Sequence, residues 1–473
     1  MSILKINPKI RHPQYEKYFP RWKAVNDICD GEHIPEYVHD IHPNDTSIEN
    51  EARNRSFKER AVFAAIAGYT AKGLTGTVFT KWPSLKIPPQ LEYMQESADG
   101  SGVSIYQQSQ TTIKDQVRVG RAGLFVDFPA NQSDTSQADI QSGDLFSPIM
   151  HIKAEQILNW NTTRYGGKTK LSLVVIYDQL RMESETGFVF DLVDVIYELR
   201  LVEGVYVFKE WRTSIVGGGA WQKVDEVIPR DGAGNTWDEI PFTFVGSNDN
   251  TPDVDPPPMY DIVRVNIGHL NNSAIYEDAV FITGQPQPWM SGIDFDYVQQ
   301  AQNAGMYFGA PVMLPVPSGE TFGIAQASEN TMAKEAMTDK INTMIGLGAM
   351  FMQSGSVAKT ATQAAGEQMV QHSTLSLIAS NCSEAYTQAL KWAARFMGAD
   401  EDECEYTLSQ NFVDPEANPQ MLQQMIAGFL QGAIPLSDYH RWMQRNQLAD
   451  EEQSLDDYSE GLQTNQAIDL DAD

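Results

Sequence analysis

The hydrophobic positions near the start of the chain repeat with a helical period. Tyr15, Tyr18, Trp22, Val25 and Cys29 are spaced 3, 4, 3 and 4 residues apart, which predicts an amphipathic helix with one buried face. Asp30 and Gly31 predict its end. The pattern predicts two further helices, over 56–72 and over 105–119, and Gly120 is a suitable C-terminal stop for the second of these.

After Gly120 the period changes from helical to extended. Residues 122–128 (AGLFVDF) predict a strand, and the polar stretch NQSDTSQADIQSGD that follows predicts a mobile loop. Four more runs have strand character, and Glu203-Gly204 predicts a hairpin turn between two of them. These runs are 171–178, 187–201, 205–212 and 241–245. We therefore expect an antiparallel sheet region between helical segments.

The segment TPDVDPPPM (251–259) marks a boundary. Proline is tolerated in the first helical turn only, so Asp255 is a candidate N-cap for a helix over 256–283. Residues 285–325 are rich in Gly and Pro and predict a small β-rich insert, after which a helix over 328–352 is expected.

Small residues then interrupt the helical pattern over 352–360. Thr360 and Gln363 match a capping box for a long helix over 361–397, which Gly398 ends. The apolar stripe of this helix predicts a packed helix more readily than a coiled coil, because only about three heptads are present. Its members are Leu375, Ile378, Cys382, Ala385, Ala389, Trp392 and Phe396.

The 473 residues carry 63 acidic and 34 basic side chains, a net charge of −29. The length predicts two to four domains, and 42% hydrophobic residues suffice for a buried core. Proteins that bind nucleic acids tightly usually place Lys and Arg on phosphates. This chain should instead repel DNA except where local basic residues intervene. Residues 400–473 alone hold 17 Asp and Glu against Arg441 and Arg445.

The three cysteines, Cys29, Cys382 and Cys404, are odd in number and lack C-x-x-C spacing. This excludes a disulfide framework or zinc knuckle and fits a reducing cytoplasm. Cys29 and Cys382 fall on apolar helical stripes, so we interpret them as buried thiols. No segment matches a signal peptide or a membrane span, which indicates a protein made in the cytosol.

Motifs for catalysis are sparse. The sequence contains no phosphate-binding loop, no G-x-G-x-x-G after a strand, no H-E-x-x-H and no G-x-S-x-G. Ser356 and Lys359 form S-x-x-K, but the partner motifs S-D-N and K-T-G are absent. A cluster of histidines and acids is better interpreted as a solvated loop than as a metal site. It consists of His33, His39, His42, Asp40 and Asp45. We therefore expect no enzymatic activity, no cofactor and no metal site.

The order of elements resembles the portal proteins of tailed bacteriophages, and several stretches resemble one subgroup long catalogued as a domain of unknown function. These are HPQYEKYFPRWKAVNDICDG, GRAGLFVDFP, AEQILNW, PPPMYDIVRVNIGHLNNSAIYEDAVF and KTATQAAGEQ, the last leading into SLIASNCSEAYTQALKWAARFMG. They lie between residues 12 and 398. The chain departs from that pattern at Asn26-Asp27, where an Arg-Asp pair is expected, and at His33-Ile34-Pro35, where Tyr-Leu-Pro is expected.

The resemblance implies an α+β portal fold divided along the chain. Residues 1–255 would form a wing, 256–283 and 328–349 two stem helices, and 284–327 a clip. Residues 350–360 would form a tunnel loop, 361–398 a helix from channel to wing, and 399–473 an acidic crown. The implied DNA-channel residues are Gln353, Ser354, Gly355, Ser356 and Lys359. The implied partner-docking residues of the clip are Gln285, Gln287, Trp289, Tyr307 and Phe308.

The resemblance also implies a ring, usually of twelve copies, at one vertex of a virion assembled in the host cytoplasm. Its partners would be other copies of itself, double-stranded DNA without sequence preference, the terminase large subunit, a head-completion or tail adaptor protein and the major capsid protein. An acidic lumen would let DNA slide, since few cations would hold its phosphates. A separate ATPase would supply the energy.

Two other hypotheses about the function remain open. A different virion structural protein, such as a minor capsid or baseplate component, would share the acidic and motif-poor character. The helix–insert–helix–loop–helix order of residues 256–397 favours a portal protein over a minor capsid or baseplate component. A hydrolase would use Ser356 and Lys359 as its reactive pair.

Overall fold

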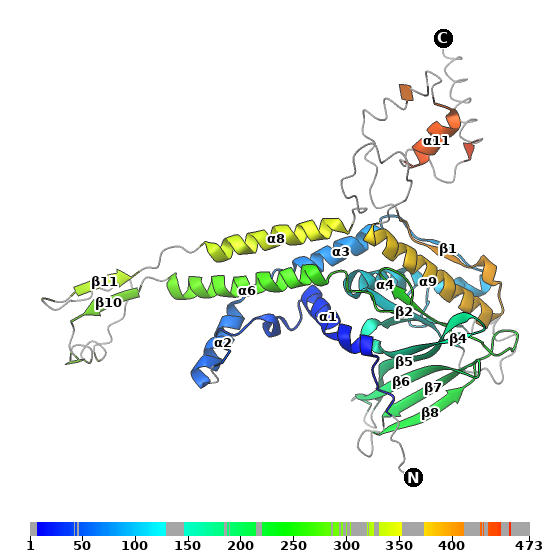
Figure 1. Ribbon diagram of the computed structural model, residues 1–473, viewed down its shortest axis with the longest axis horizontal. Helices are drawn as coiled ribbons and strands as arrows, with labels where there is room; N and C mark the ends of the chain where they lie inside the picture. Colours follow the sequence, from blue (N-terminus) through cyan, green and yellow to red (C-terminus); the bar gives the residue numbers. More distant parts are fainter. Residues whose placement is uncertain are drawn as a thin grey trace. The chain divides into compact units, whose positions relative to one another are not determined.

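A computed structural model gives the fold, and mixed helices and sheets confirm the expected α+β class (Figure 1). It describes residues 7–41, 43–44, 47–128, 146–183, 187–188, 190–213, 220–284, 287–292, 295–296, 299, 303, 319, 321–325, 331–351, 373–410, 426–427, 429, 434–445 and 454–455. The chain divides into two compact units, Met1–Gln410 and Asn411–Asp473. Among the described residues, no helix combines the length and the apolar character needed to span a bilayer.

The first helix, α1 (Pro13–Asp30), confirms the predicted amphipathic face. Tyr15, Trp22 and Val25 are buried, and Gly31 ends the helix in the left-handed conformation at φ 74°. Helix α4 (Ile105–Val119) is confirmed as well, with Ser104 as its N-cap and Gly120 at φ 73° as its C-cap. A 3-10 turn, η1 (Ile34–Tyr37), follows α1.

The single helix predicted over 56–72 is wrong. The structure has two helices, α2 (Ile48–Arg60) and α3 (Ile66–Val78). Side chains from a distant helix satisfy the backbone of the break between them. Ser273 accepts a hydrogen bond from Val62 N (3.1 Å) and donates one to Val62 O (2.8 Å). Asn266 accepts from Ala67 N (3.0 Å) and donates to Ala64 O (2.9 Å).

Two larger sheets, besides two strand pairs, form the β part that the structure describes. The first has the order β3-β2-β9 and is antiparallel, with β2 (Arg121–Val126) between β3 (Ile149–Lys153) and β9 (Phe242–Gly246). All six residues of β2 are buried, because the strand is central and covered on both faces. The 3-10 turn η3 (Ala154–Gln156) follows β3. The predicted strand over 122–128 is thus confirmed in kind and shifted by one to two residues. The predicted loop after it lies outside the described residues.

The second sheet is an antiparallel meander in the order β4-β5-β6-β7-β8. Its strands are β4 (Ile157–Tyr165), β5 (Lys168–Glu183), β6 (Phe190–Val202), β7 (Val205–Thr213) and β8 (Trp221–Val227). Glu203 (φ 51°) and Gly204 (φ 86°) make the predicted turn between β6 and β7, both with positive φ as a two-residue hairpin requires. Strands β4 and β8 were not predicted.

The helix expected over 256–283 is α6 (Tyr260–Thr283), and it starts later than predicted. Asp255 is not its cap, because its carboxylate accepts hydrogen bonds from Asn248 N (2.7 Å) and Asn248 Nδ2 (3.1 Å) in the preceding loop. The insert contains an antiparallel pair, β10 (Gln287–Ser291) and β11 (Thr321–Ala325). Helix α8 (Met332–Met350) follows it.

The last long helix, α9 (Thr374–Met397), is shorter than the predicted 361–397. Ser373 has extended backbone and caps the helix by accepting from Ser376 N (3.2 Å), so the helix cannot continue through it. The Thr360 and Gln363 capping box lies outside the described residues. The predicted apolar stripe is buried throughout, and Gly398 ends the helix at φ 66°. All three cysteines are buried as well, and burial raises the pKa of Cys29 and Cys404 to about 11.

The acidic segment predicted as one region over 399–473 is divided. After the 3-10 turn η4 (Glu401–Glu403), β12 (Glu405–Thr407) pairs antiparallel with β1 (Ser84–Lys86), which precedes the 3-10 helix η2 (Pro89–Gln95). Residues up to Gln410 therefore belong to the first compact unit. The second unit contains the helix α11 (Leu436–Arg445).

Candidate functional site

The segment from α6 to α8 is a helical hairpin, which we define as residues 260–350. Helices α6 and α8 lie side by side and contact each other along their length (Figure 1). At Gly268, an added Cβ would lie 3.0 Å from Lys340 Cε, so the missing side chain on α6 gives space to the lysine of α8. In chain order the β10–β11 pair stands between these two helices.

Polar side chains of α6 hold the hairpin to the N-terminal helices. Asp278 is only 8% exposed and accepts hydrogen bonds from both Arg53 (2.9 and 2.5 Å) and Arg60 (3.0 Å) of α2. The Arg60 guanidinium also lies 3.8 Å from the centre of the Phe281 ring. Buried carboxylates are stable when they are paired in this way. No pattern in the sequence predicted this role for Asp278.

Helix α8 buries very little of its own surface. Met344 is its one buried residue among those described, whereas Met332, Ile345 and Met350 are 74%, 62% and 62% exposed. On the far half of α6, Ile275 is 55% exposed and Ile282 47%. Helices of this length are held mostly by packing of an apolar face, so these exposed apolar residues indicate a surface that another chain covers.

The β10–β11 pair also presents apolar side chains to solvent. Trp289 lies opposite Gly323 in the ladder, and a Cβ on Gly323 would meet the indole at 2.7 Å, so only glycine lets the ring lie across β11. Trp289 is 46% exposed, and Phe322 and Ile324 of β11, which sequence reasoning missed, are 39% and 62% exposed. A two-stranded hairpin is marginally stable in water by itself, so a partner surface would stabilise it.

The structure describes only part of the predicted site. Trp289 and the backbone of Gln287 lie in β10, whereas Gln285, Tyr307 and Phe308 lie outside the described residues. All five predicted channel residues, Gln353, Ser354, Gly355, Ser356 and Lys359, also lie outside them. Phe351, directly after α8, lies close to Leu375 in α9, because Leu375 N donates a hydrogen bond to Phe351 O (3.3 Å). The end of α8 and the start of α9 therefore lie next to each other.

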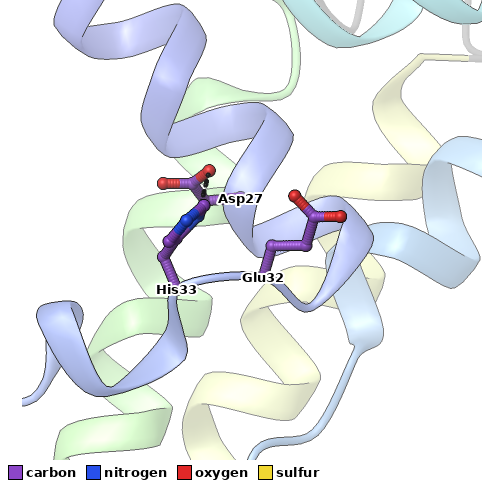
Figure 2. Close-up of side chains that lie close together, drawn as sticks. All are labelled: Asp27, Glu32 and His33. Atoms are coloured by element: carbon purple, nitrogen blue, oxygen red, sulfur yellow. Dashed lines mark hydrogen bonds and ion pairs between the residues drawn. The ribbon is translucent and has the colours of Figure 1, made fainter. Parts of the chain in front are cut away.

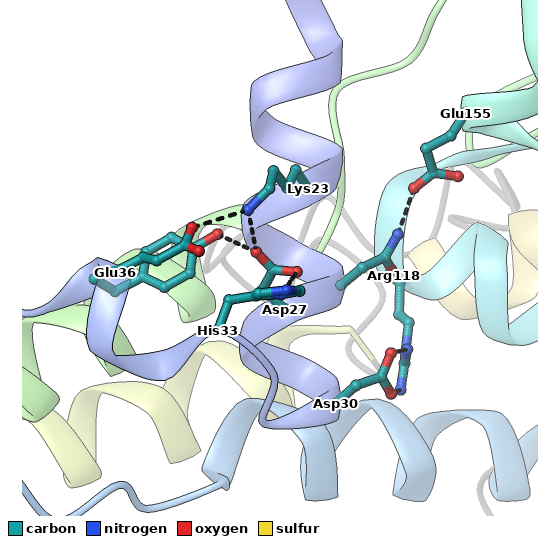
Figure 3. A network of polar contacts seen from close by, with 9 residues as sticks. Lys23, Asp27, Asp30, His33, Glu36, Arg118 and Glu155 are labelled. Atoms are coloured by element: carbon teal, nitrogen blue, oxygen red, sulfur yellow. Dashed lines mark hydrogen bonds and ion pairs between the residues drawn. The ribbon is translucent and has the colours of Figure 1, made fainter. Parts of the chain in front are cut away.

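A polar network around α1 explains the departure at Asn26-Asp27 (Figure 3). Asn26 Nδ2 donates to Glu155 Oε1 (2.5 Å), and Asp27 accepts from Lys23 (2.8 Å) and Tyr37 (2.7 Å). Burial raises the pKa of Glu155. Burial opposes ionisation of Asp27 too, but hydrogen bonds from its partners lower the pKa of Asp27 below its usual value. Asn26 thus joins α1 to η3 through Glu155.

Asp27, Glu32 and His33 lie close together, with ligand atoms within 4.8 Å of one another (Figure 2). Asp27 is already occupied by Lys23 and Tyr37, and its other oxygen lies 3.2 Å from His33 Nδ1. Glu32 and His33 are exposed. Asp27 and His33 are therefore part of the polar network of α1, and Glu32 lies beside it at the surface. His39 is exposed, and His42 and Asp45 lie outside the described residues.

Comparison with known proteins gives one family match. The model of a family described as "Domain of unknown function (DUF4055)" matches residues 258–397, which hold the helical hairpin and α9. No curated protein sequence matches the chain.

Among solved structures, the chain is similar to one from the neck of a native GTA particle computed with C12 symmetry. The identity is 11% and the TM-score 0.42, over 82% of this chain and 92% of that chain. A chain from the neck of an empty GTA particle computed with C6 symmetry gives 11% identity and a TM-score of 0.37, over 76% of this chain and 85% of that chain. Scores this low carry no argument, so the functional assignment depends on the contacts described above.

Proposed function

We propose that this chain is a portal protein, a subunit of a ring at one vertex of a tailed-phage capsid that conducts double-stranded DNA during packaging and ejection. The observation that carries the proposal is the exposed apolar surface of α8 and the far half of α6. Helix α8 has one buried residue among its described residues, and a ring of copies would bury the others against neighbours.

The order of elements supports the same proposal. In a portal protein, the chain forms a stem helix, the clip, a second stem helix, the tunnel loop and the channel-to-wing helix, in that order. This chain has two packed helices with a strand pair between them in sequence, and then a long buried helix. The end of α8 and the start of α9 lie close together, as the two ends of a loop would. Here α6 and α8 are the stem, and β10–β11 with Trp289 the part of the clip that docks the terminase and then the tail adaptor. Lys359 is the cation of the tunnel loop.

The charges of the hairpin fit a conduit better than a DNA-binding surface. Helix α6 carries Asp261, Arg264, Glu277 and Asp278, and α8 carries Lys334, Glu335, Asp339 and Lys340. Asp278 is neutralised by Arg53 and Arg60. Because acidic and basic side chains nearly balance, the helices provide few cations for phosphates, and DNA of any sequence could slide past them. No catalytic role is part of the proposal.

Negative-stain microscopy and mass photometry of the full chain test the proposal. Particles with a central hole and a mass that is a fixed multiple of 52.8 kDa are expected, with twelve copies as the proposed number. Since some rings need a template, the measurement is repeated after coexpression with the major capsid protein of the same genome. Monomers in both conditions would contradict the proposal.

A further inference from the structure

A cavity of about 290 Å³ lies between the two sheets, far in sequence from the helical hairpin. The three-stranded sheet contributes residues of β2 and β3 to it, and the five-stranded sheet contributes residues of β5, β6, β7 and β8. None of its lining residues belongs to the proposed stem, clip or tunnel loop. The portal proposal therefore gives this cavity no role.

Aromatic rings form much of the cavity wall. The Phe208 ring lies 5.3 Å from that of Phe128 and is nearly perpendicular to it, and 5.8 Å from that of Tyr197, to which it is roughly parallel. Phe125 is stacked on Phe208 at 6.5 Å. The faces of aromatic rings carry partial negative charge and attract cations at such distances.

Four carboxylates line the same cavity: Asp127, Asp178, Glu210 and Asp225. Glu210 and Asp225 are direct partners in the β7–β8 ladder, an arrangement that repels when both are ionised. Arg212 pairs with Glu210. Within the described part of the chain, Asp127, Asp178 and Asp225 have no cationic partner, so the cavity carries an excess of negative charge.

The polar groups inside the cavity show the same lack of partners. Burial raises the pKa of Asp127 to about 6, and among the described residues its carboxylate accepts one hydrogen bond, from Phe128 N (2.8 Å). Burial, followed by the charges of Asp178, Glu210 and Asp127, raises the pKa of Tyr197 to about 12, as expected for a hydroxyl that lines the same cavity as these carboxylates.

Tyr206 is a buried neighbour of the wall residue Phe208 and is not itself among the residues that line the cavity. It lies two residues before Phe208 on the same face of β7, is 0% exposed, and its hydroxyl has no hydrogen-bond partner among the residues that the structure describes. The Asp127 carboxylate acts on it electrostatically, so the two groups are near each other. The surroundings of Asp127 therefore include a second buried polar group, the Tyr206 hydroxyl.

We propose that this cavity binds an organic cation, an alkylammonium or guanidinium group held between the aromatic rings and the carboxylates. The ammonium or guanidinium donates hydrogen bonds to Asp127 and Asp225, which then no longer lack partners. The aromatic rings contact the aliphatic or planar part of the ligand. A neutral ligand of the same shape would leave the carboxylates unpaired. The cation has two possible sources, a free diamine or a basic side chain of another protein.

Isothermal titration calorimetry of the full chain at about pH 8, above the pKa of Asp127, and at low salt tests the proposal. The probes are 1,4-diaminobutane, N-acetylarginine N-methylamide and, as the uncharged control, 1,4-butanediol. We expect at least one of the two cations to bind and the diol not to bind. Binding of the diamine alone identifies a free amine as the ligand, and binding of the arginine derivative alone identifies a protein side chain.

Variants assign the binding to the cavity. Asp127→Asn is expected to weaken binding about tenfold, and Asp225→Asn, at an exposed position that folding tolerates, at least about threefold. The matched control is Asp191→Asn, an exposed carboxylate of β6 outside the cavity, which should leave the affinity unchanged. Equal affinity for the diol, no binding of either cation, or an equal loss in the control would overturn the proposal.

Discussion

The guanidinium of Arg118 donates two hydrogen bonds of 2.8 Å to the carboxylate of Asp30, and this pair joins helix α4 to the end of helix α1. The Arg118 side chain is 3% exposed and that of Asp30 41% exposed. Bidentate pairing of this kind fixes orientation as well as charge. It also places the Arg118 charge where water cannot solvate it.

We predict that Asp30→Asn lowers the free energy of unfolding of the first unit by roughly 1–3 kcal/mol at neutral pH. Breaking a fully buried pair usually costs more, but the exposure of Asp30 reduces the effect through solvent screening. Urea unfolding measures it. Glu32→Gln, at an exposed position two residues on, is the control and should change stability by less than about 0.5 kcal/mol.

The same pair predicts a pH dependence. Burial opposes ionisation of Asp30, but the hydrogen bonds and charge of Arg118 outweigh it and lower the pKa of Asp30 below its usual value of 3.8. A carboxylate with a lowered pKa stabilises the fold above its unfolded pKa and loses that contribution as the pH falls. The difference between wild type and Asp30→Asn should be constant above about pH 5 and shrink below pH 3.8. A difference that grows on acidification would contradict this.

For Asp127 we predict the opposite dependence of stability on pH. Its pKa is raised by burial to about 6, so the folded state binds a proton more tightly than the unfolded state, and stability falls as the pH rises from about 4 to 6. Without a bound cation, Asp127→Asn should therefore raise stability at pH 8 by roughly 1–3 kcal/mol and have little effect at pH 4. Thermal unfolding at both pH values measures this, and the Asp191→Asn control should show no such difference.

Replacing glycine by alanine should have opposite effects on stability at two positions of α3. A Cβ at Gly68 would collide with the backbone carbonyl of Cys29, because α3 crosses α1 there, whereas Gly73 has nothing within 4 Å. Gly68→Ala should lower the free energy of unfolding by about 2 kcal/mol or more, since backbone atoms must move. Gly73→Ala should raise it by about 0.5–1 kcal/mol through helix propensity. Equal effects in chemical unfolding would show that the α1–α3 crossing is looser than described.

The proposed ring predicts that charge on the exposed apolar surface of α8 blocks assembly. Ile345→Asp introduces a carboxylate where a neighbouring copy would pack, so it should convert rings to free subunits while changing subunit stability by less than about 0.5 kcal/mol. Mass photometry and thermal unfolding measure the two effects. The control is Asn342→Asp, which adds the same charge at an exposed polar position of α8. Rings of Ile345→Asp would show that α8 lies outside the interface.

The features that the sequence predicted correctly are local. Gly31, Gly120 and Gly398 end their helices in the left-handed conformation, and Glu203-Gly204 turns the hairpin, because in each case a few adjacent residues determine the backbone. The stripe of α9 was predictable for the same reason, since its spacing alone determines the buried face. For the candidate site, the order of two helices with a strand-containing insert between them was predictable.

The features that were missed depend on distant partners. The break between α2 and α3 contains neither Gly nor Pro, and it exists because Asn266 and Ser273 of α6 take its backbone hydrogen bonds. Asp255 has the residue type of a cap but bonds to Asn248 instead. Single-sequence patterns carry no information about such pairings, so the predicted helix ran through the break. The cavity between the sheets was missed because its walls come from six separate strands.

The pairing of β1 with β12 has a consequence for the order of events in the cell. Glu405–Thr407 must reach Ser84–Lys86 before this sheet exists, and the buried Tyr406 hydroxyl lies 2.7 Å from Ser109 Oγ of α4. A ribosome must therefore have released about residue 407 before the first unit can close. The unit therefore completes its fold only after nearly all of it has been synthesised, and any assembly of copies that needs the closed unit must wait until then.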